Sequence, residues 1–207
     1  MVKMAEKKRG ATMDMTLGAL EYYLIGINIL GFILYGINTL LYRFTADAQI
    51  DTVLTITSLL GGSLGMVLCI LLFDRKSVKD NMMSRVFVSC MFVIQLVAYL
   101  FLKGQRGQEL TFAFWEFFAA NKFLIVYLIA INVITLIAFG IDKINAIERR
   151  GRIRILTLLG LSFIGGSVGG LIAMYAFRHK TKKDYFTVGL PLIMVMQVVV
   201  VFYLMNL

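Results

Sequence analysis

The sequence predicts an all-α integral membrane protein with six transmembrane helices, arranged as two three-helix repeats of inverted topology. The first observation behind this fold class is the composition: 59% of the 207 residues are hydrophobic, 16% are charged, and the mean hydropathy is +0.83. Such values are typical of polytopic membrane proteins. The second is a set of six apolar runs, each close to the length of about 20 residues that a helix needs to cross the hydrocarbon. These runs cover residues 18–38, 53–73, 84–102, 121–141, 155–177 and 186–205.

The third observation is an internal repeat. When the sequence is shifted against itself by 104 residues, about 58 positions align without a gap, from Tyr23 with Tyr127 to Asp80 with Asp184. Glycines spaced four residues apart give a helix a flat face on which another backbone can pack closely. The predicted packing residues are therefore the matching glycines of the two repeats: Gly61, Gly62 and Gly65 in the first, and Gly165, Gly166 and Gly169 in the second.

The repeat divides the chain into segments. Residues 1–17 form an N-terminal segment, 18–102 the first repeat, 103–120 a connector and 121–207 the second repeat. Because a unit of three spans ends on the opposite face from its start, the second repeat enters the membrane inverted, about an axis in the membrane plane. The connector carries Trp115 and four Phe residues in a stretch too short to span, which predicts an amphipathic helix at the membrane interface.

The basic residues predict the orientation. With six spans, 13 of the 21 Lys and Arg residues fall on the side of the N-terminus and 8 on the other side. Basic loops favour the cytoplasmic face, so both termini are predicted to be cytoplasmic in a multi-pass protein of the inner membrane. The exception is the basic loop 178–184, which this topology places outside. The net charge of +9 is concentrated between apolar runs, which indicates membrane orientation and no nucleic-acid partner.

Four amides are candidates for a ligand site or pathway. Asn28 and Asn132 lie near the middle of the first and fourth spans, where an unpaired amide is unfavourable. Inverted symmetry would let them meet each other or line one central cavity; the alternative is a pair of ordinary interhelical hydrogen bonds. Gln95 and Gln197 lie deep in the third and sixth spans but are two positions out of repeat register.

Charged candidates lie at the predicted membrane faces. Asp142 and Lys143 end the fourth span, and Asp142 is expected to pair with a cation from elsewhere, specifically Arg75 or Lys76 of the first repeat; the alternative is an interfacial charge pair that marks the helix end. Basic residues close to the bilayer attract anionic lipids, although they can also serve only as topology signals. The candidates for an anionic headgroup or ligand are Arg75, Lys76, Arg149, Arg150, Arg152, Arg154, Arg178, His179 and Lys180.

Motifs of catalysis are absent from the sequence. It contains no metal-ligand spacing, phosphate loop, nucleophile–base pair or paired carboxylates. Cys69 and Cys90 lie inside predicted spans and are interpreted as small apolar residues. The sequence therefore predicts no enzyme, no catalytic residue, no metal and no cofactor.

Several motifs of the second repeat resemble one protein family. Asn132, Phe139, Asp142-Lys143, Ala146, Arg149-Arg150, Gly165-Gly166 with Gly169, and the run Phe177–Lys182 look like the DUF1294 family of small prokaryotic membrane proteins. The resemblance covers about residues 127–186, most of the second repeat. The first repeat keeps Asn28 and Lys76 but has Asn38-Thr39 and Asp74-Arg75 at two of these motifs, so it resembles a degenerate copy. The resemblance implies no established activity.

Two functions follow as hypotheses. The first is a small transporter or channel-like protein that moves a small solute, ion or lipid through a polar midplane, as inverted repeats commonly do. The alternative is a lipid-binding or membrane-complex assembly module without transport, whose basic loops hold anionic headgroups. Membrane lipids, mainly anionic, are the expected partners, and a homodimer is possible. A polar, water-accessible centre would favour transport, and a filled, dry centre would favour the alternative.

Overall fold

The computed structural model describes residues 18–44, 50–74, 81–104 and 110–207. This part of the chain is all-helical. Six helical segments are long and apolar enough to cross a membrane: Ala19–Leu41, Asp51–Phe73, Met82–Gly104, Lys122–Ile147, Ile155–Ala176 and Asp184–Met205. The chain is therefore a multi-pass membrane protein, as predicted. The N-terminal segment 1–17 and the candidates Arg75 and Lys76 lie outside the described residues.

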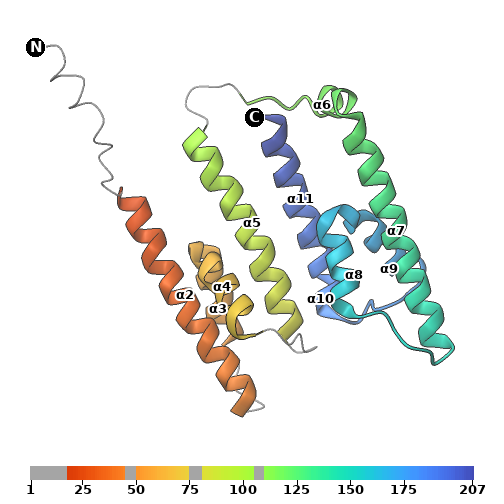
Figure 1. The fold of residues 1–207 in the computed structure, drawn as a ribbon, viewed down its shortest axis with the longest axis horizontal. Coiled ribbons are helices and arrows are strands. Elements are labelled where there is room, and N and C mark those ends of the chain that lie inside the picture. Colours follow the sequence, from red (N-terminus) through yellow and green to blue (C-terminus); the bar gives the residue numbers. More distant parts are fainter. Residues whose placement is uncertain (1–17, 45–49, 75–80, 105–109) are drawn as a thin grey trace, which may run out of the picture.

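In the described ranges, the two repeats contain corresponding helices in the same order, and the second has one additional short helix, α10 (Asp184–Thr187) (Figure 1). The first has α2 (Ala19–Phe44), α3 (Asp51–Thr57), the π-helical turn η1 (Ser58–Gly62), α4 (Ser63–Phe73) and α5 (Met82–Gly104). The second has α7 (Lys122–Ile147), α8 (Ile155–Leu161), η3 (Ser162–Gly166), α9 (Ser167–Ala176), α10 and α11 (Gly189–Met205). Between the repeats lies α6 (Phe114–Ala120).

The middle segment of the second repeat is a hairpin, not a straight helix. Gly165 has a φ of +133°, a left-handed conformation in which the chain reverses direction. A Cβ on Gly170 would lie 2.9 Å from Ser162 Oγ, whereas eight residues of straight α-helix would separate these positions by about 12 Å. The backbone N–H of Ile153 and the ring of His179 both bond to the carboxylate of Asp142. The segment therefore enters and leaves at the same end of α7.

The first repeat folds back in the same way. Gly61 has a φ of +113°. The N–H of Ile50, before α3, donates to Asn38 Oδ1 at 3.3 Å, while Asp74, after α4, accepts the Tyr35 hydroxyl at 3.4 Å. Tyr35 and Asn38 are one turn apart on α2, so both ends of this hairpin also lie together. In Figure 1, α8 and α9 lie beside the lower part of α7, away from the end where α6 lies.

This geometry overturns the predicted inverted arrangement. The third helices of the two repeats, α5 and α11, lie side by side: Gly189 faces Val86 near one end, and the rings of Phe101 and Phe202 stack with centroids 6.3 Å apart near the other. Low-numbered residues thus meet at one end and high-numbered residues at the other, so equivalent helices run parallel. The symmetry axis runs along the helices. The physical reason is that a unit of two crossing helices and one returning hairpin ends on the face where it began.

The repeated glycines have two separate roles. A Cβ on Gly65 would overlap the backbone oxygen of Asn28, and one on Gly169 would overlap that of Asn132. These glycines provide the close helix approach that the sequence predicted. Gly61 and Gly165 instead form the hairpin turns, which the sequence did not reveal.

The connector joins the repeats at the end opposite the hairpin bases. Thr111 donates its N–H to Asn206 Oδ1 at 2.8 Å, which fixes the connector to the end of α11. Trp115 is 89% exposed and Phe112 71% exposed. Exposed aromatic side chains at a helix-bundle end suit a membrane interface, and the location of the connector at that interface stays a prediction.

Candidate functional site

A glutamine of the third helix caps the hairpin tip in each repeat. The break in the second hairpin leaves backbone carbonyls without helical partners, and Gln197 Nε2 donates to two of them, Ser162 O at 2.7 Å and Phe163 O at 3.1 Å. Ser167 Oγ donates to Gln197 Oε1 at 2.5 Å. The glutamine thereby satisfies the broken backbone at membrane depth, as an apolar environment requires.

Gln95 makes the equivalent contacts in the first repeat. Its Nε2 donates to Ser58 O at 2.5 Å and to Leu59 O at 3.3 Å, and Ser63 Oγ bonds to its Oε1. The sequence interpretation of Gln95 and Gln197 as non-equivalent was therefore wrong. Nineteen residues separate Arg178 from Gln197, against 21 from Asp74 to Gln95. The connection between hairpin and third helix is two residues shorter in the second repeat, and this shifts the sequence register while the contacts are kept.

The two asparagines fasten each hairpin to its own long helix. Asn132 Nδ2 donates to Leu128 O at 2.7 Å and to Gly165 O at 2.9 Å, and its Oδ1 accepts the N–H of Gly169 at 2.6 Å. Asn28 Oδ1 likewise accepts the N–H of Gly65 at 2.8 Å. Asn28 and Asn132 therefore bond to the hairpin of their own repeat and not to each other. These are the ordinary interhelical hydrogen bonds that the sequence left open as the alternative.

A buried ion cluster closes the base of the second hairpin. Asp142 is fully buried; its Oδ2 lies 2.8 Å from His179 Nε2 and 2.7 Å from Lys180 Nζ, and its Oδ1 accepts the N–H of Ile153 at 3.0 Å. We call Asp142, His179 and Lys180 the second latch. Burial lowers the pKa of Lys180, while the hydrogen bond and charge of Asp142 oppose this effect. The Lys180 ammonium also lies 4.8 Å from the centroid of the Phe186 ring.

The latch partly fulfils the sequence prediction. Asp142 does pair with a cation from elsewhere, but the cation comes from its own hairpin; the expected partners Arg75 and Lys76 lie outside the described residues. The neighbouring candidate Lys143 is half-buried and is not a member of the latch.

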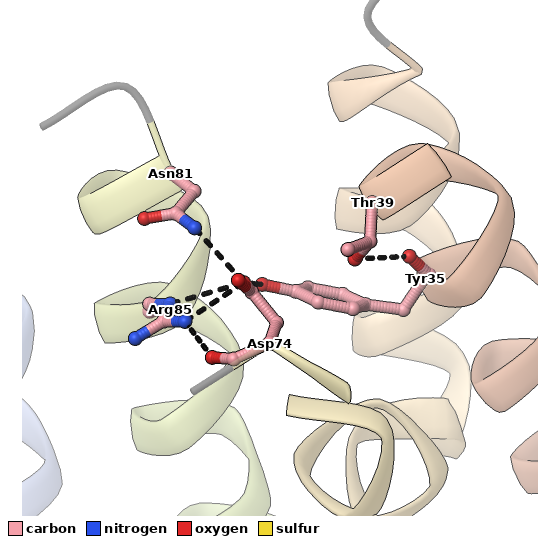
Figure 2. A network of polar contacts seen from close by, with 5 residues as sticks. All are labelled: Tyr35, Thr39, Asp74, Asn81 and Arg85. Carbon is pink, nitrogen blue, oxygen red and sulfur yellow. Dashed lines mark hydrogen bonds and ion pairs between the residues drawn. The ribbon is translucent and has the colours of Figure 1, made fainter. Parts of the chain in front are cut away.

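The first repeat closes its hairpin with different residues (Figure 2). Asp74 pairs with Arg85 of α5, with Nη2 2.8 Å from Oδ2, and also accepts bonds from Asn81 Nδ2 at 2.9 Å and from Tyr35 Oη. Asn38 replaces Asp142 and still accepts the N–H of the loop that enters the hairpin. We call Asp74, Arg85, Asn81 and Tyr35 the first latch. The carboxylate has moved from the long helix to the hairpin, and the cation to the third helix.

Sequence reasoning did not select the residues of the first latch as candidates. The available signal was Asp74, a lone acid at the end of an apolar run, with Arg85 following eleven residues later. Both side chains are nearly buried, with exposures of 11% and 12%. An acid at a predicted helix end and a base at the start of the next apolar run could have suggested a pair.

A groove lies above the tip of the first hairpin, between α2 and α5. It has a volume of about 460 Å³ and half of its lining residues are leucines, with Leu20 and Leu102 at the end away from the hairpin. The polar lining residues Asn28, Ser63 and Gln95 form the hydrogen bonds at the hairpin tip that are described above. Leucines 20, 59, 60, 64, 96 and 102 of its wall are exposed, so the groove opens to the surroundings of the helices.

The tip beneath this groove contains an unsatisfied hydroxyl. Ser58 is fully buried, and its Oγ is without a hydrogen-bond partner in the described structure, whereas Ser162 of the second repeat donates to Leu158 O at 2.9 Å. Such groups are rare in native interiors. Across the described ranges, no group of three His, Cys, Asp or Glu side chains could hold a metal ion.

Comparison with known proteins locates the family signal in the second repeat. A family model described as a protein of unknown function (DUF1294) matches residues 132–186. This range begins at Asn132, includes the second hairpin and latch, and ends at Phe186. The uncharacterized protein YsdA of Bacillus subtilis is 35% identical over 75 residues, which cover 36% of this chain and 84% of YsdA. No solved structure matches the chain.

Proposed function

The chain belongs to the DUF1294 family, a family without an assigned activity, and from its geometry we propose that it is a lipid-binding membrane protein. The site is the groove of the first repeat, and its occupant is one hydrocarbon chain of a membrane lipid. The observation that carries the proposal is a groove of about 460 Å³ with leucine walls that is open to the surroundings of the helices. Ligand pockets commonly have such volumes and mainly apolar walls.

The polar groups at the base of the groove favour an apolar occupant. The amides of Asn28 and Gln95 already bond to the protein backbone, so a hydrophilic solute would have to break these bonds to gain its own. The helices α5 and α11 also contact each other directly where the repeats meet. These features support lipid binding over the passage of a polar solute.

Transport of an amphipathic molecule is the second candidate. It is favoured by the two hairpins, whose glycine turns interrupt the helices at membrane depth as in many transporters. The unpaired hydroxyl of Ser58 at one such turn is a further point in its favour.

The fold also changes the proposed orientation. Ten of the described Lys and Arg side chains belong to the end with the hairpin bases: Arg85, Lys143, Arg149, Arg150, Arg152, Arg154, Arg178, Lys180, Lys182 and Lys183. Two, Lys103 and Lys122, belong to the opposite end. By the positive-inside rule, the hairpin bases face the cytoplasm and the C-terminus faces away from it, the reverse of the sequence-based orientation. Residence in the inner membrane and the possible homodimer stay predictions.

Photolabelling tests the groove. Full-length protein is reconstituted with phosphatidylcholine that carries a photoactivatable diazirine in one acyl chain, and labelled peptides are mapped by mass spectrometry. Ala98 lines the groove on α5, so Ala98→Trp should fill it. Excluding two methylenes lowers affinity about 10-fold, and labelling of groove peptides should fall accordingly.

Ala130→Trp is the matched control, because Ala130 is an exposed alanine of α7 outside this groove. Equal labelling of groove peptides in wild type and Ala98→Trp would contradict lipid binding there. If labelling is lost and the wild type also moves fluorescent lipid between leaflets of a vesicle, while Ala98→Trp does not, transport replaces simple binding as the function.

A further inference from the structure

The second latch brings two basic loops together. One carboxylate, that of Asp142, holds Ile153 of the loop after α7 and both His179 and Lys180 of the loop after α9. The charge of Arg152 in the first loop also contributes to lowering the pKa of Lys180 in the second. The basic loops 148–154 and 177–183 therefore meet at the entrance of the second hairpin.

These loops carry a large excess of exposed positive charge. Seven cationic side chains are exposed there, and we call them the basic mouth: Arg149, Arg150, Arg152, Arg154, Arg178, Lys182 and Lys183. The exposed acids of the same region are Glu148 and Asp184. Glu148 pairs with Arg150 at 3.0 Å. Most of the basic mouth is therefore left to attract an external anion.

Two of these arginines occupy unfavourable backbone positions. Arg149 and Arg178 have φ values of +56° and +45°, at the residue after the helix cap where glycine is usual. The helix ends form the matching bonds: Arg150 N–H donates to Asn145 O at 2.9 Å, and His179 N–H donates to Met174 O at 3.0 Å. A cation there is attracted to the helix C-terminus, yet both side chains are exposed and available to a ligand. The same arrangement places one exposed arginine at each of two neighbouring helix ends.

The surface beside the basic mouth is apolar. Ile147 is 68% exposed and Leu156 57% exposed, one at the end of α7 and the other at the start of α8. A site with cations next to exposed aliphatic side chains matches a molecule with an anionic group joined to hydrocarbon. A polyanion such as RNA would use the charges and leave the aliphatic residues unexplained.

We propose that the basic mouth binds the phosphate-containing headgroup of an anionic phospholipid, with the acyl chains against Ile147 and Leu156. This site is separate from the groove, which belongs to the first repeat and extends toward the other end of α2 and α5. The inference does not rest on the proposed function, and either one can fail without the other.

The test measures thermal stabilisation of the full-length protein in a neutral detergent, with phosphatidylglycerol, phosphatidylcholine or inorganic phosphate as the probe. Phosphatidylglycerol should raise Tm in a saturable manner, phosphatidylcholine should not, and about 1 M salt should remove the effect by screening. The variant Arg152→Gln/Arg178→Gln should bind phosphatidylglycerol about 30-fold more weakly, as expected for the loss of two cations near an anionic headgroup. The lysine variant Arg152→Lys/Arg178→Lys should retain most of the affinity.

The matched control is Lys103→Gln/Lys122→Gln, which removes the same charge at the opposite end and should retain the phosphatidylglycerol shift. Loss of the shift in this control, or its retention in the glutamine variant of the mouth, would overturn the proposal. Equal stabilisation by inorganic phosphate would show a site for free anions and would also overturn it. A short RNA that raises Tm and displaces phosphatidylglycerol would overturn the proposal as well. If the glutamine variant does not fold, the decision rests on the wild-type comparison of the three probes and on the lysine variant.

Discussion

Replacement of Asp142 by Asn tests the second latch directly, because Asn has nearly the same shape without the charge. Asn38 already occupies the equivalent position in the first repeat, where its Oδ1 accepts the N–H of Ile50. Asp142→Asn should therefore keep the bond from Ile153 and lose the carboxylate oxygen that contacts Lys180 and His179. The variant isolates the electrostatic part of the latch.

The expected effect is large because Lys180 stays almost buried, with 8% of its side chain exposed. Removing one partner of a buried ion pair costs about 3–5 kcal/mol. We expect about 3 kcal/mol for Asp142→Asn, the lower end, since Lys180 lies in a loop and can turn toward water. Asp142→Ala should lose about 1 kcal/mol more, because the N–H of Ile153 also loses its acceptor.

The assay is equilibrium unfolding in mixed micelles of a neutral detergent and SDS, followed by circular dichroism. The double variant Asp142→Asn/Lys180→Gln should recover part of the loss, because the unpaired cation is gone. Asp184→Asn, an exposed acid in the same region, should change the unfolding free energy by less than about 0.5 kcal/mol. If Asp142→Asn stays within about 1 kcal/mol of wild type and the double variant shows no recovery, the latch does not stabilise the hairpin as argued.

Three further predictions follow from the hairpins. Gly165→Ala should lower the unfolding free energy by about 1–3 kcal/mol, since a side chain is strained at its φ of +133°; an unchanged value would argue against the turn. Gln197→Leu should cost about 2 kcal/mol in the same assay by leaving two partly buried carbonyls unpaired, and a neutral result would show that the cap is dispensable. In a cysteine-free background, single cysteines at Arg149 and Thr181 should react with an impermeant maleimide from one side of the membrane, and a cysteine at Trp115 from the other; opposite labelling of the first two would restore the inverted arrangement.

The sequence predicted the repeat well because the contacts follow the same 104-residue spacing. Tyr23 donates its hydroxyl to Leu60 O, and Tyr127 donates to Ile164 O, 104 residues later in both partners. Helix positions were predictable from apolar length alone. A polar side chain that bonds to one residue in the first repeat tends to bond to the equivalent residue in the second. Matched polar residues in the sequence therefore indicate matched contacts.

The hairpins were not predictable from apolar length and composition. A run of 22 residues from Ile155 to Ala176 has the length and hydropathy of a straight span, and its glycine pair suits close packing equally well. What distinguishes the two folds is a tertiary contact, such as Gly170 against Ser162, which no local pattern encodes. With each hairpin counted as a crossing helix, the orientation predicted for the whole second repeat was wrong.

The latches show a different limit of the sequence. Position-by-position alignment pairs Asp142 with Asn38 and Arg178 with Asp74, which suggests that the first repeat has lost its charges. The structure shows that the ion pair has been kept and moved to other helices. Compensation of this kind is visible only when the helices are placed together.

The returning hairpin has a consequence for how such a chain could arise. Because each unit starts and finishes on one face, two copies can be joined head to tail by a short linker without either having to be turned over during insertion. A relative such as YsdA, of which 75 residues are 84%, is about 89 residues long, enough for one unit. Fusion of two such genes would keep both units in the same orientation in the membrane. One copy would then be free to diverge.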